Sequence, residues 1–133
     1  MPVMPLYASV GSNDIDRAVA FYEGLLGTIG WSRSFPNPAG GCFFGHPDTG
    51  MFAVVRPFDG NDACVGNGAM VGFALSSNAA VDDFHAKALA LGATDEGVPG
   101  YRGPEEFGAY FSYFRDLDGN KLTAYCWKLP PQA

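Results

Sequence analysis

The hydrophobic positions of this sequence change spacing along the first half of the chain. Residues 6–11 are typical of a short strand, and the polar residues 12–14 offer side chains that can cap the start of a helix. Apolar side chains then recur at helical spacing over residues 15–26. Gly27 follows them and is placed to end this helix in a left-handed turn.

Short extended segments separated by turn sequences make up the rest of the first half. Proline, asparagine and glycine cluster over residues 36–41, and residues 46–50 form a second turn signal. Around these turns we predict strands over residues 29–35, 42–45 and 51–56. The first half therefore predicts the order strand, helix and three strands.

The second half repeats this order after a linker rich in Gly, Asn and Asp over residues 59–68. A strand is predicted over residues 69–75. A helix follows with an apolar face of Val81, Phe84, Ala88, Leu89 and Leu91, and Gly92 stops it. Residues 110–115 and 121–125 predict a hairpin around Asp118-Gly119-Asn120. A shift of the sequence that brings Tyr7 onto Met70 also brings Phe21 onto Phe84, so the two halves share one pattern.

These repeats predict an α+β fold built from two βαβββ units, over about residues 4–58 and 68–128, within one domain of residues 1–133. Neither small sheet can bury both of its faces alone. We therefore expect the two to join into a curved, partly open mixed sheet, with the helices outside and a concave pocket inside. That pocket is the expected place for chemistry or binding.

Composition and charge narrow the function classes. A net charge of -6, with 8 Lys and Arg scattered along the chain, argues against nucleic-acid binding, which depends on neutralising phosphates. The N-terminus shows no basic segment followed by an apolar stretch, and no run is long enough to span a bilayer. Cys42, Cys64 and Cys126 are odd in number and far apart, which argues against disulfides and a thiolate zinc site. We expect a cytoplasmic protein with no membrane partner.

Several sequence motifs, in order along nearly the whole chain, resemble the vicinal oxygen chelate superfamily, which includes glyoxalases, bleomycin resistance proteins and dioxygenases. Residues 14–27 (DIDRAVAFYEGLLG) are similar to its first-helix signature, and residues 115–122 (RDLDGNKL) are similar to its final hairpin, with Leu117 where Pro is usual. Residues 66–68 (GNG), 81–89 (VDDFHAKAL) and 97–100 (GVPG) resemble a glyoxalase-like subgroup. Together the motifs identify the family but not a function.

The resemblance implies a divalent metal held by four side chains, two from each repeat. Counting from the matching motifs places Tyr7, Ala53, Met70 and Thr123 at these positions. A phenol, a methyl, a thioether and a hydroxyl do not supply the imidazole or carboxylate donors that such an ion prefers. We therefore expect no metal and no other cofactor.

Strand alternation predicts the side chains that face the concave pocket. It puts Tyr7, Ser9, Ala53, Met70, Thr123 and Tyr125 on this inner face, and Tyr110 is expected to add another ring. Apolar groups mixed with hydroxyls suit a small aromatic or amphipathic ligand. The opposing interpretation is that these side chains pack together and leave no cavity.

Other candidate residues have ordinary structural explanations. His85 lies beside the apolar face of the second helix, where a packing or surface role is the more common one. His46 and the pair Glu105 and Glu106 lie in turns and loops, where solvated side chains are the simpler interpretation. Arg102 could recognise an anionic group on a ligand, although a surface ion pair is its simpler role.

Three functions are compatible with these observations. The favoured hypothesis is a metal-free binding protein similar to the bleomycin resistance proteins. The alternative is a lyase, isomerase or dioxygenase like other members of the superfamily, using a displaced metal or none. The third is a degenerate domain kept for subunit association. The resemblance also implies a homodimer, and the catalytic residues, if any exist, are not identified.

Overall fold

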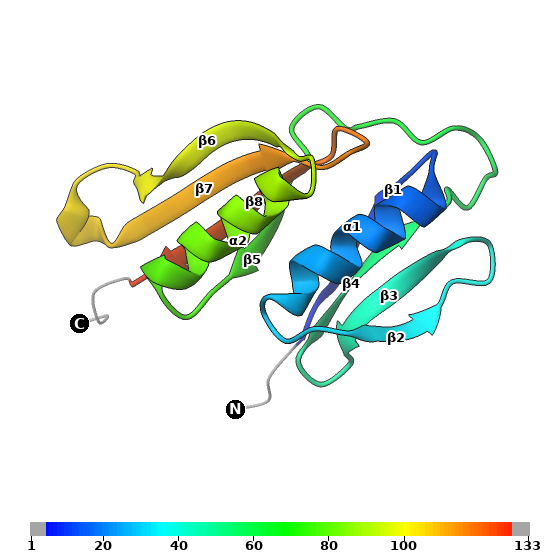
Figure 1. Ribbon diagram of the computed structural model, residues 1–133, viewed down its shortest axis with the longest axis horizontal. Helices are drawn as coiled ribbons and strands as arrows, with labels where there is room; N and C mark the ends of the chain where they lie inside the picture. The colour runs from blue at the N-terminus through cyan, green and yellow to red at the C-terminus, as the bar shows by residue number, and fades with distance from the viewer. Residues whose placement is uncertain (1–4, 129–133) are drawn as a thin grey trace. The chain divides into compact units, whose positions relative to one another are not determined.

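The computed structural model describes residues 5–128, and the chain divides into two compact units, Met1–Asn67 and Gly68–Ala133. Their boundary lies inside the predicted linker. The first unit contains five elements in the order predicted from the sequence: β1 (Tyr7–Gly11), α1 (Ile15–Gly27), β2 (Arg33–Pro36), β3 (Gly41–His46) and β4 (Gly50–Val55) (Figure 1).

Helix α1 begins where the sequence predicts, because the Asp14 carboxylate accepts a hydrogen bond from the backbone N–H of Arg17. Its end differs from the prediction. Thr28 caps the helix in a right-handed conformation, and the positive φ of 80° falls at Gly30 rather than at Gly27. The chain therefore turns through residues 28–32, and the strand predicted over 29–35 is shortened to β2.

The first sheet has the strand order β1-β4-β3-β2, with β1 parallel to β4 and antiparallel pairing elsewhere. Helix α1 packs on β3 and β4 and covers one face of this sheet. Its buried residues Tyr22, Leu25 and Leu26 meet the sheet at side chains such as Phe52, whose ring centroid lies 4.7 Å from that of Tyr22. This apolar layer is the core of the first unit.

The second unit repeats the first and adds a short 3₁₀ helix. Its elements are β5 (Val71–Ala74), α2 (Asn78–Ala90), β6 (Thr94–Tyr101), η1 (Glu105–Phe107), β7 (Ala109–Arg115) and β8 (Lys121–Trp127). The repeat requires β6, but the sequence pattern does not locate it. Its pairing with β7 is interrupted twice, around Gly97 and before Gly100, so the strand lacks regular alternation.

The second sheet has the order β5-β8-β7-β6, and α2 packs on β6, β7 and β8. Val81, Phe84 and Ala88 of α2 are fully buried against this sheet. Leu89, predicted on the same apolar face, is instead 37% exposed. The α+β class and the two βαβββ units are confirmed. Among residues 5–128, neither helix has the length and apolar character needed to cross a membrane.

Candidate functional site

In each unit the sheet has one face under its helix and one opposite it, which we call the helix-free face. Parallel strand partners point to the same side of a sheet. Ser9 pairs with Ala53 between β1 and β4, and Gly72 pairs with Thr123 between β5 and β8. Ala53 and Thr123 therefore occupy equivalent places in the two units.

Two aromatic rings meet over the first of these places. Tyr7 on β1 and Phe43 on β3 make an edge-to-face contact with ring centroids 5.7 Å apart. Because β4 lies between β1 and β3, the rings can meet only across β4, where Phe43 pairs with Ala53. The Ala53 side chain is 0% exposed as a result, whereas Tyr7 stays 59% exposed.

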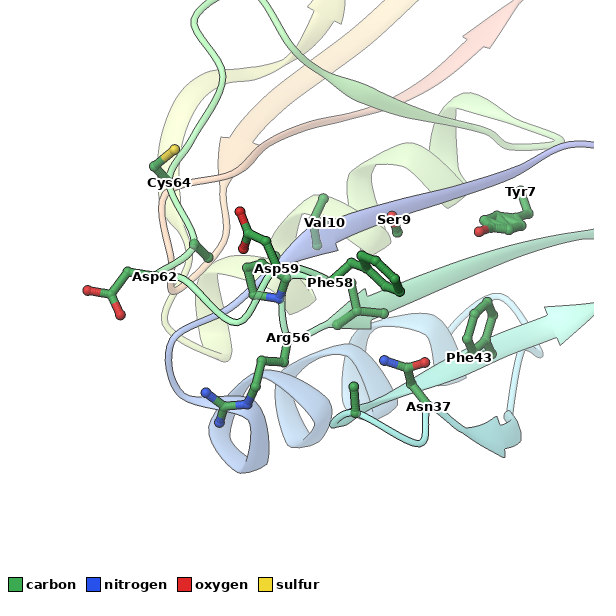
Figure 2. Close-up of a pocket in the computed structure, with 15 residues that line it drawn as sticks. Tyr7, Ser9, Val10, Asn37, Phe43, Arg56, Phe58, Asp59, Asp62 and Cys64 are labelled. Carbon is green, nitrogen blue, oxygen red and sulfur yellow. The ribbon is translucent and has the colours of Figure 1, made fainter.

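A pocket of about 590 Å³ opens beside these rings on the first unit. Figure 2 shows Tyr7 and Phe43 reaching it from β1 and β3, with Phe58 from the segment that follows β4. Ser9 and Asn37 add polar groups to its lining. Two of the predicted ligand-binding residues, Tyr7 and Ser9, thus lie together in one pocket.

The segment after β4 forms one wall of this pocket and is tied back to the start of α1. The side-chain amide of Asn13 donates to the carbonyl oxygen of Ala63 at 2.9 Å, and its carbonyl oxygen accepts from the N–H of Ala63 at 2.7 Å. A Cβ at Gly11 would lie 2.9 Å from the Ala63 Cβ, so the absence of a side chain there lets the segment approach. Arg56 and Asp59 also line the pocket and bring both signs of charge to it.

The helix-free face of the second sheet holds two of the other predicted residues. Thr123 is 2% exposed, and its hydroxyl donates to the carbonyl oxygen of Ser112 at 2.7 Å. Tyr125 lies over Gly72, because a Cβ on that glycine would be 3.1 Å from the tyrosine ring. Met70 precedes β5 and is exposed.

Tyr110 does not lie on this face. It pairs with Cys126, which neighbours Tyr125 on β8 and therefore points to the opposite face. Tyr110 thus lies on the face that carries α2. Its hydroxyl donates to the Asp82 carboxylate at 2.6 Å. This hydrogen bond, together with burial and the nearby negative charge, raises the pKa of Tyr110 to about 12. The phenol ties β7 to α2.

Neither the two histidines nor the paired glutamates line the first pocket. His85 is 3% exposed, with Nε2 3.1 Å from the Asp95 carboxylate and its ring edge-on to Phe114. The His46 Nδ1 accepts a hydrogen bond from the N–H of Asp48 within an exposed turn. Glu105 and Glu106 lie in the exposed η1.

Sequence reasoning missed several aromatic residues of the helix-free faces. Phe111, Tyr113 and Trp127 lie beside Tyr125 on the second sheet, and Phe43 lies beside Tyr7 on the first. The signal was available in the hairpin. Its register pairs Arg115 with Lys121, which puts the odd-numbered residues of β7 and β8 on one face.

A second pocket of about 800 Å³ lies between the start of α1 and the β2–β3 hairpin. It contains none of the predicted ligand-binding residues. Burial raises the pKa of the Cys42 thiol in its wall. Arg33 in its lining forms an ion pair with Glu23. The guanidinium is therefore less available to a ligand than the polar groups of the first pocket.

The side chains at the four expected metal positions do not fit a divalent ion. Ala53 has no donor atom, and the Thr123 hydroxyl is already committed to Ser112. Tyr7 and Met70 would have to contribute a neutral phenol and a thioether, which hard cations bind poorly. Elsewhere in residues 5–128, no three His, Cys, Asp or Glu side chains gather so that they could hold a metal ion.

No protein-family model matches this sequence, and no curated protein matches it either. Solved structures do match. A glyoxalase/bleomycin resistance protein from Albidiferax ferrireducens is 37% identical, with a TM-score of 0.81 over 92% of this chain and 97% of that one. A lactoylglutathione lyase from Agrobacterium tumefaciens is 22% identical, with a TM-score of 0.67 over 93% of each chain.

A third match is a glyoxalase/bleomycin resistance protein/dioxygenase family enzyme from Burkholderia phytofirmans, 16% identical, with a TM-score of 0.69 over 92% of this chain and 97% of that one. At such low identity it and the lyase show a shared fold alone. The Albidiferax protein is similar in sequence as well as in fold, over nearly its whole length. The chain therefore belongs to the glyoxalase and bleomycin resistance group of the vicinal oxygen chelate superfamily.

Proposed function

We propose that this protein binds a small aromatic or amphipathic molecule without a metal, on the helix-free faces of its sheets. The proposal is carried by the side chains at the four expected metal positions. They are a phenol, a methyl, a thioether and a hydroxyl that is hydrogen-bonded to Ser112. A set of this kind does not supply the charged donors that metal-dependent chemistry needs.

The first unit's pocket supports the kind of ligand proposed. Tyr7 and Phe43 provide apolar ring surface, and Ser9 and Asn37 provide hydrogen-bonding groups at the same pocket. Small-molecule sites combine mostly apolar walls with a few polar groups that fix orientation. An amphipathic molecule with one aromatic ring matches this combination.

Metal analysis of protein purified without a chelator tests the absence of a bound ion. We expect no zinc, nickel, manganese or iron at a stoichiometric level. One ion per chain, lost when Thr123 is replaced by Val or Met70 by Leu, would overturn the proposal. The lyase, isomerase or dioxygenase alternative would then take precedence.

Ligand binding is tested by thermal shift and calorimetry with cinnamyl alcohol and cinnamamide. Cinnamyl alcohol, the probe for the first pocket, should bind about ten-fold more weakly to Tyr7→Ala, because one aromatic contact is lost. Tyr7→Phe is the matched control, since it keeps the ring and should keep the affinity. If neither compound nor any related aromatic molecule stabilises the protein, the binding function is wrong.

A further inference from the structure

Four aromatic side chains form a continuous surface on the helix-free face of the second sheet, which we call the aromatic platform: Phe111, Tyr113, Tyr125 and Trp127. Phe111 lies at its centre. The centroid of its ring lies 4.9 Å from that of Tyr125 and 6.1 Å from that of Tyr113, and both of these rings are nearly parallel to it. Trp127 meets Phe111 edge-on at 5.5 Å and is 50% exposed. Phe111 and Tyr125 stack on each other, and Trp127 is the most exposed of the four rings.

The platform is not needed to complete the core of its unit. Within residues 68–128 the α-helix packs on the opposite face, where Phe84 meets Phe114 and Leu122 is fully buried. The four platform rings are half-buried or exposed. A cluster of this many incompletely buried aromatic rings on one sheet face is typical of a binding surface.

Two cations lie over one ring of the platform. The Arg102 guanidinium carbon is 5.4 Å from the centre of the Tyr113 ring, and the Lys121 ammonium nitrogen is 5.3 Å from it. Neither has a carboxylate within ion-pair distance among residues 5–128. The acid on this side, Glu96, is paired with Arg115. Lys121 also lies near enough to Glu96 to lower the pKa of that carboxyl, but Arg102, Lys121 and Arg115 together outnumber this one carboxylate. The charge around Tyr113 is therefore net positive, in a chain whose net charge is -6.

The local backbone holds Arg102 in place. Its Nη1 donates to the carbonyl oxygen of Gly100 at 3.0 Å, and its Nη2 donates to that of Val98 at 2.8 Å. Gly97 leaves room for this arrangement, because a Cβ there would be 3.0 Å from the Tyr113 ring and 3.2 Å from Nη2. A guanidinium has five N–H donors, so three remain for a ligand.

We propose that the platform binds a planar aromatic anion, such as an aromatic carboxylate. The ring of the ligand packs against the exposed Trp127 and the neighbouring Phe111, and its negative group lies at Arg102 and Lys121. The proposal names the ligand class for the function proposed above and rests on that function. An excess of cations beside aromatic rings complements an anionic aromatic molecule and disfavours a cationic one.

The test compares three ligands that share a planar ring and differ in charge: cinnamate, cinnamamide and cinnamylamine. Calorimetry on the full chain should show the order cinnamate, cinnamamide, cinnamylamine from tightest to weakest. We expect cinnamate to bind about five-fold more tightly than the amide at low ionic strength, as one favourable surface charge interaction predicts. Salt should reduce this preference, since exposed charges are screened.

Variants locate the site. Lys121→Gln should abolish most of the preference for cinnamate, and it breaks no ion pair or side-chain hydrogen bond in the described chain. Arg102→Gln should act in the same direction, although it also removes two bonds to the backbone. Phe111→Leu should weaken cinnamate and cinnamamide alike. In Trp31→Phe, the remaining tryptophan, Trp127, should report cinnamate binding by a change in fluorescence.

Four results would overturn the proposal. Equal affinity for the three compounds, or unchanged preference in Lys121→Gln, would exclude the anion site. Cinnamate binding that is lost in Tyr7→Ala but kept in Phe111→Leu would place the ligand in the first pocket and leave the general binding function intact. Self-association that Trp127→Ala abolishes, with no cinnamate binding, would identify the platform as a contact between two copies of the chain.

Discussion

The hydroxyl of Thr123 on β8 lies 2.7 Å from the carbonyl oxygen of Ser112 on β7, to which it donates a buried hydrogen bond. Thr123→Val keeps the size and branching of the side chain and removes this bond. The variant should therefore lose about 1 kcal/mol of the free energy of unfolding, measured in urea. Thr94→Val is the control, because Thr94 is exposed at the start of β6. An unchanged stability in Thr123→Val would show that the hydroxyl is free to serve another role.

Stability at alkaline pH should depend on Tyr110. The hydrogen bond to Asp82 raises the pKa of this phenol from 10.0 to about 12 in the folded protein. Because the folded pKa is the higher one, the protonated phenol stabilises the native state fully below pH 10, and this contribution is lost as the pH rises from 10 to 12. Tyr110→Phe and Asp82→Ala should both flatten this part of the stability profile.

Spectrophotometric titration of tyrosine ionisation gives an independent measurement. The wild-type protein should show one tyrosine that ionises near pH 12, and Tyr110→Phe should lack it. Asp82→Ala should return that ionisation toward the ordinary tyrosine range, since the acceptor is gone. A wild-type titration without a late-ionising tyrosine would contradict the Tyr110–Asp82 hydrogen bond.

The sequence predicts much of the fold because local signals agree with the tertiary structure. The cap at Asp14, the helical spacing after it and the turn at Asp118 to Asn120 each specify an element that the structure contains. The sequence pattern does not locate β6, because its pairing with β7 and its alternation are interrupted around Gly97 and before Gly100. The expectation that Tyr110 faces the pocket is wrong, because the register of the hairpin pairs Tyr110 with Cys126 on the face that carries α2.

The pocket wall illustrates what a sequence pattern does not contain. It depends on the hydrogen bonds between Asn13 and Ala63, which are 50 residues apart. Nothing in the local sequence of the Gly- and Asp-rich linker indicates that it folds back onto the end of β1. The same is true of Arg102, whose position over Tyr113 depends on a contact between β7 and the loop that follows β6.

Loss of the two hydrogen bonds between Asn13 and Ala63 should open the first pocket. Asn13→Ala removes both hydrogen bonds to Ala63, and Gly11→Ala forces the Ala63 backbone away by crowding its Cβ. In either variant, limited proteolysis should cut within residues 57–64 faster than in the wild type, and the exposed Cys64 thiol should react faster with a disulfide reagent. Asn13→Asp, which keeps one acceptor, should show a smaller effect. Equal cleavage rates in all variants would contradict this role.

Pairing of repeats across subunits is common in this superfamily, and we propose that this chain forms a homodimer. Exposed apolar side chains such as Leu6, Phe58 and Val98 provide surface that association could bury. Sedimentation equilibrium should give a mass twice the 14.1 kDa of one chain. A single species of one chain's mass at micromolar concentration would contradict the proposal.

The contact between His85 and Asp95 joins α2 to β6. Asp95 Oδ1 lies 3.1 Å from the His85 Nε2, whose N–H it can accept, and also accepts the N–H of Gly97 at 3.0 Å. Asp95→Ala removes both bonds and leaves a buried imidazole nitrogen without its partner, so the free energy of unfolding should fall by about 1–3 kcal/mol. Asp95→Asn keeps an acceptor oxygen and should lose less.

Amide hydrogen exchange separates this local effect from a general loss of stability. The N–H of Gly97 should exchange faster in Asp95→Ala than in Asp95→Asn, whereas the amides of β1 and β4 in the first unit should change less. Such a pattern assigns His85 to anchoring α2 on its sheet, because the bond that is lost joins these two elements. Asp83 is an exposed acid on α2, so Asp83→Ala is the control. If the free energy of unfolding of Asp95→Ala is no lower than that of Asp83→Ala, the anchoring role is wrong.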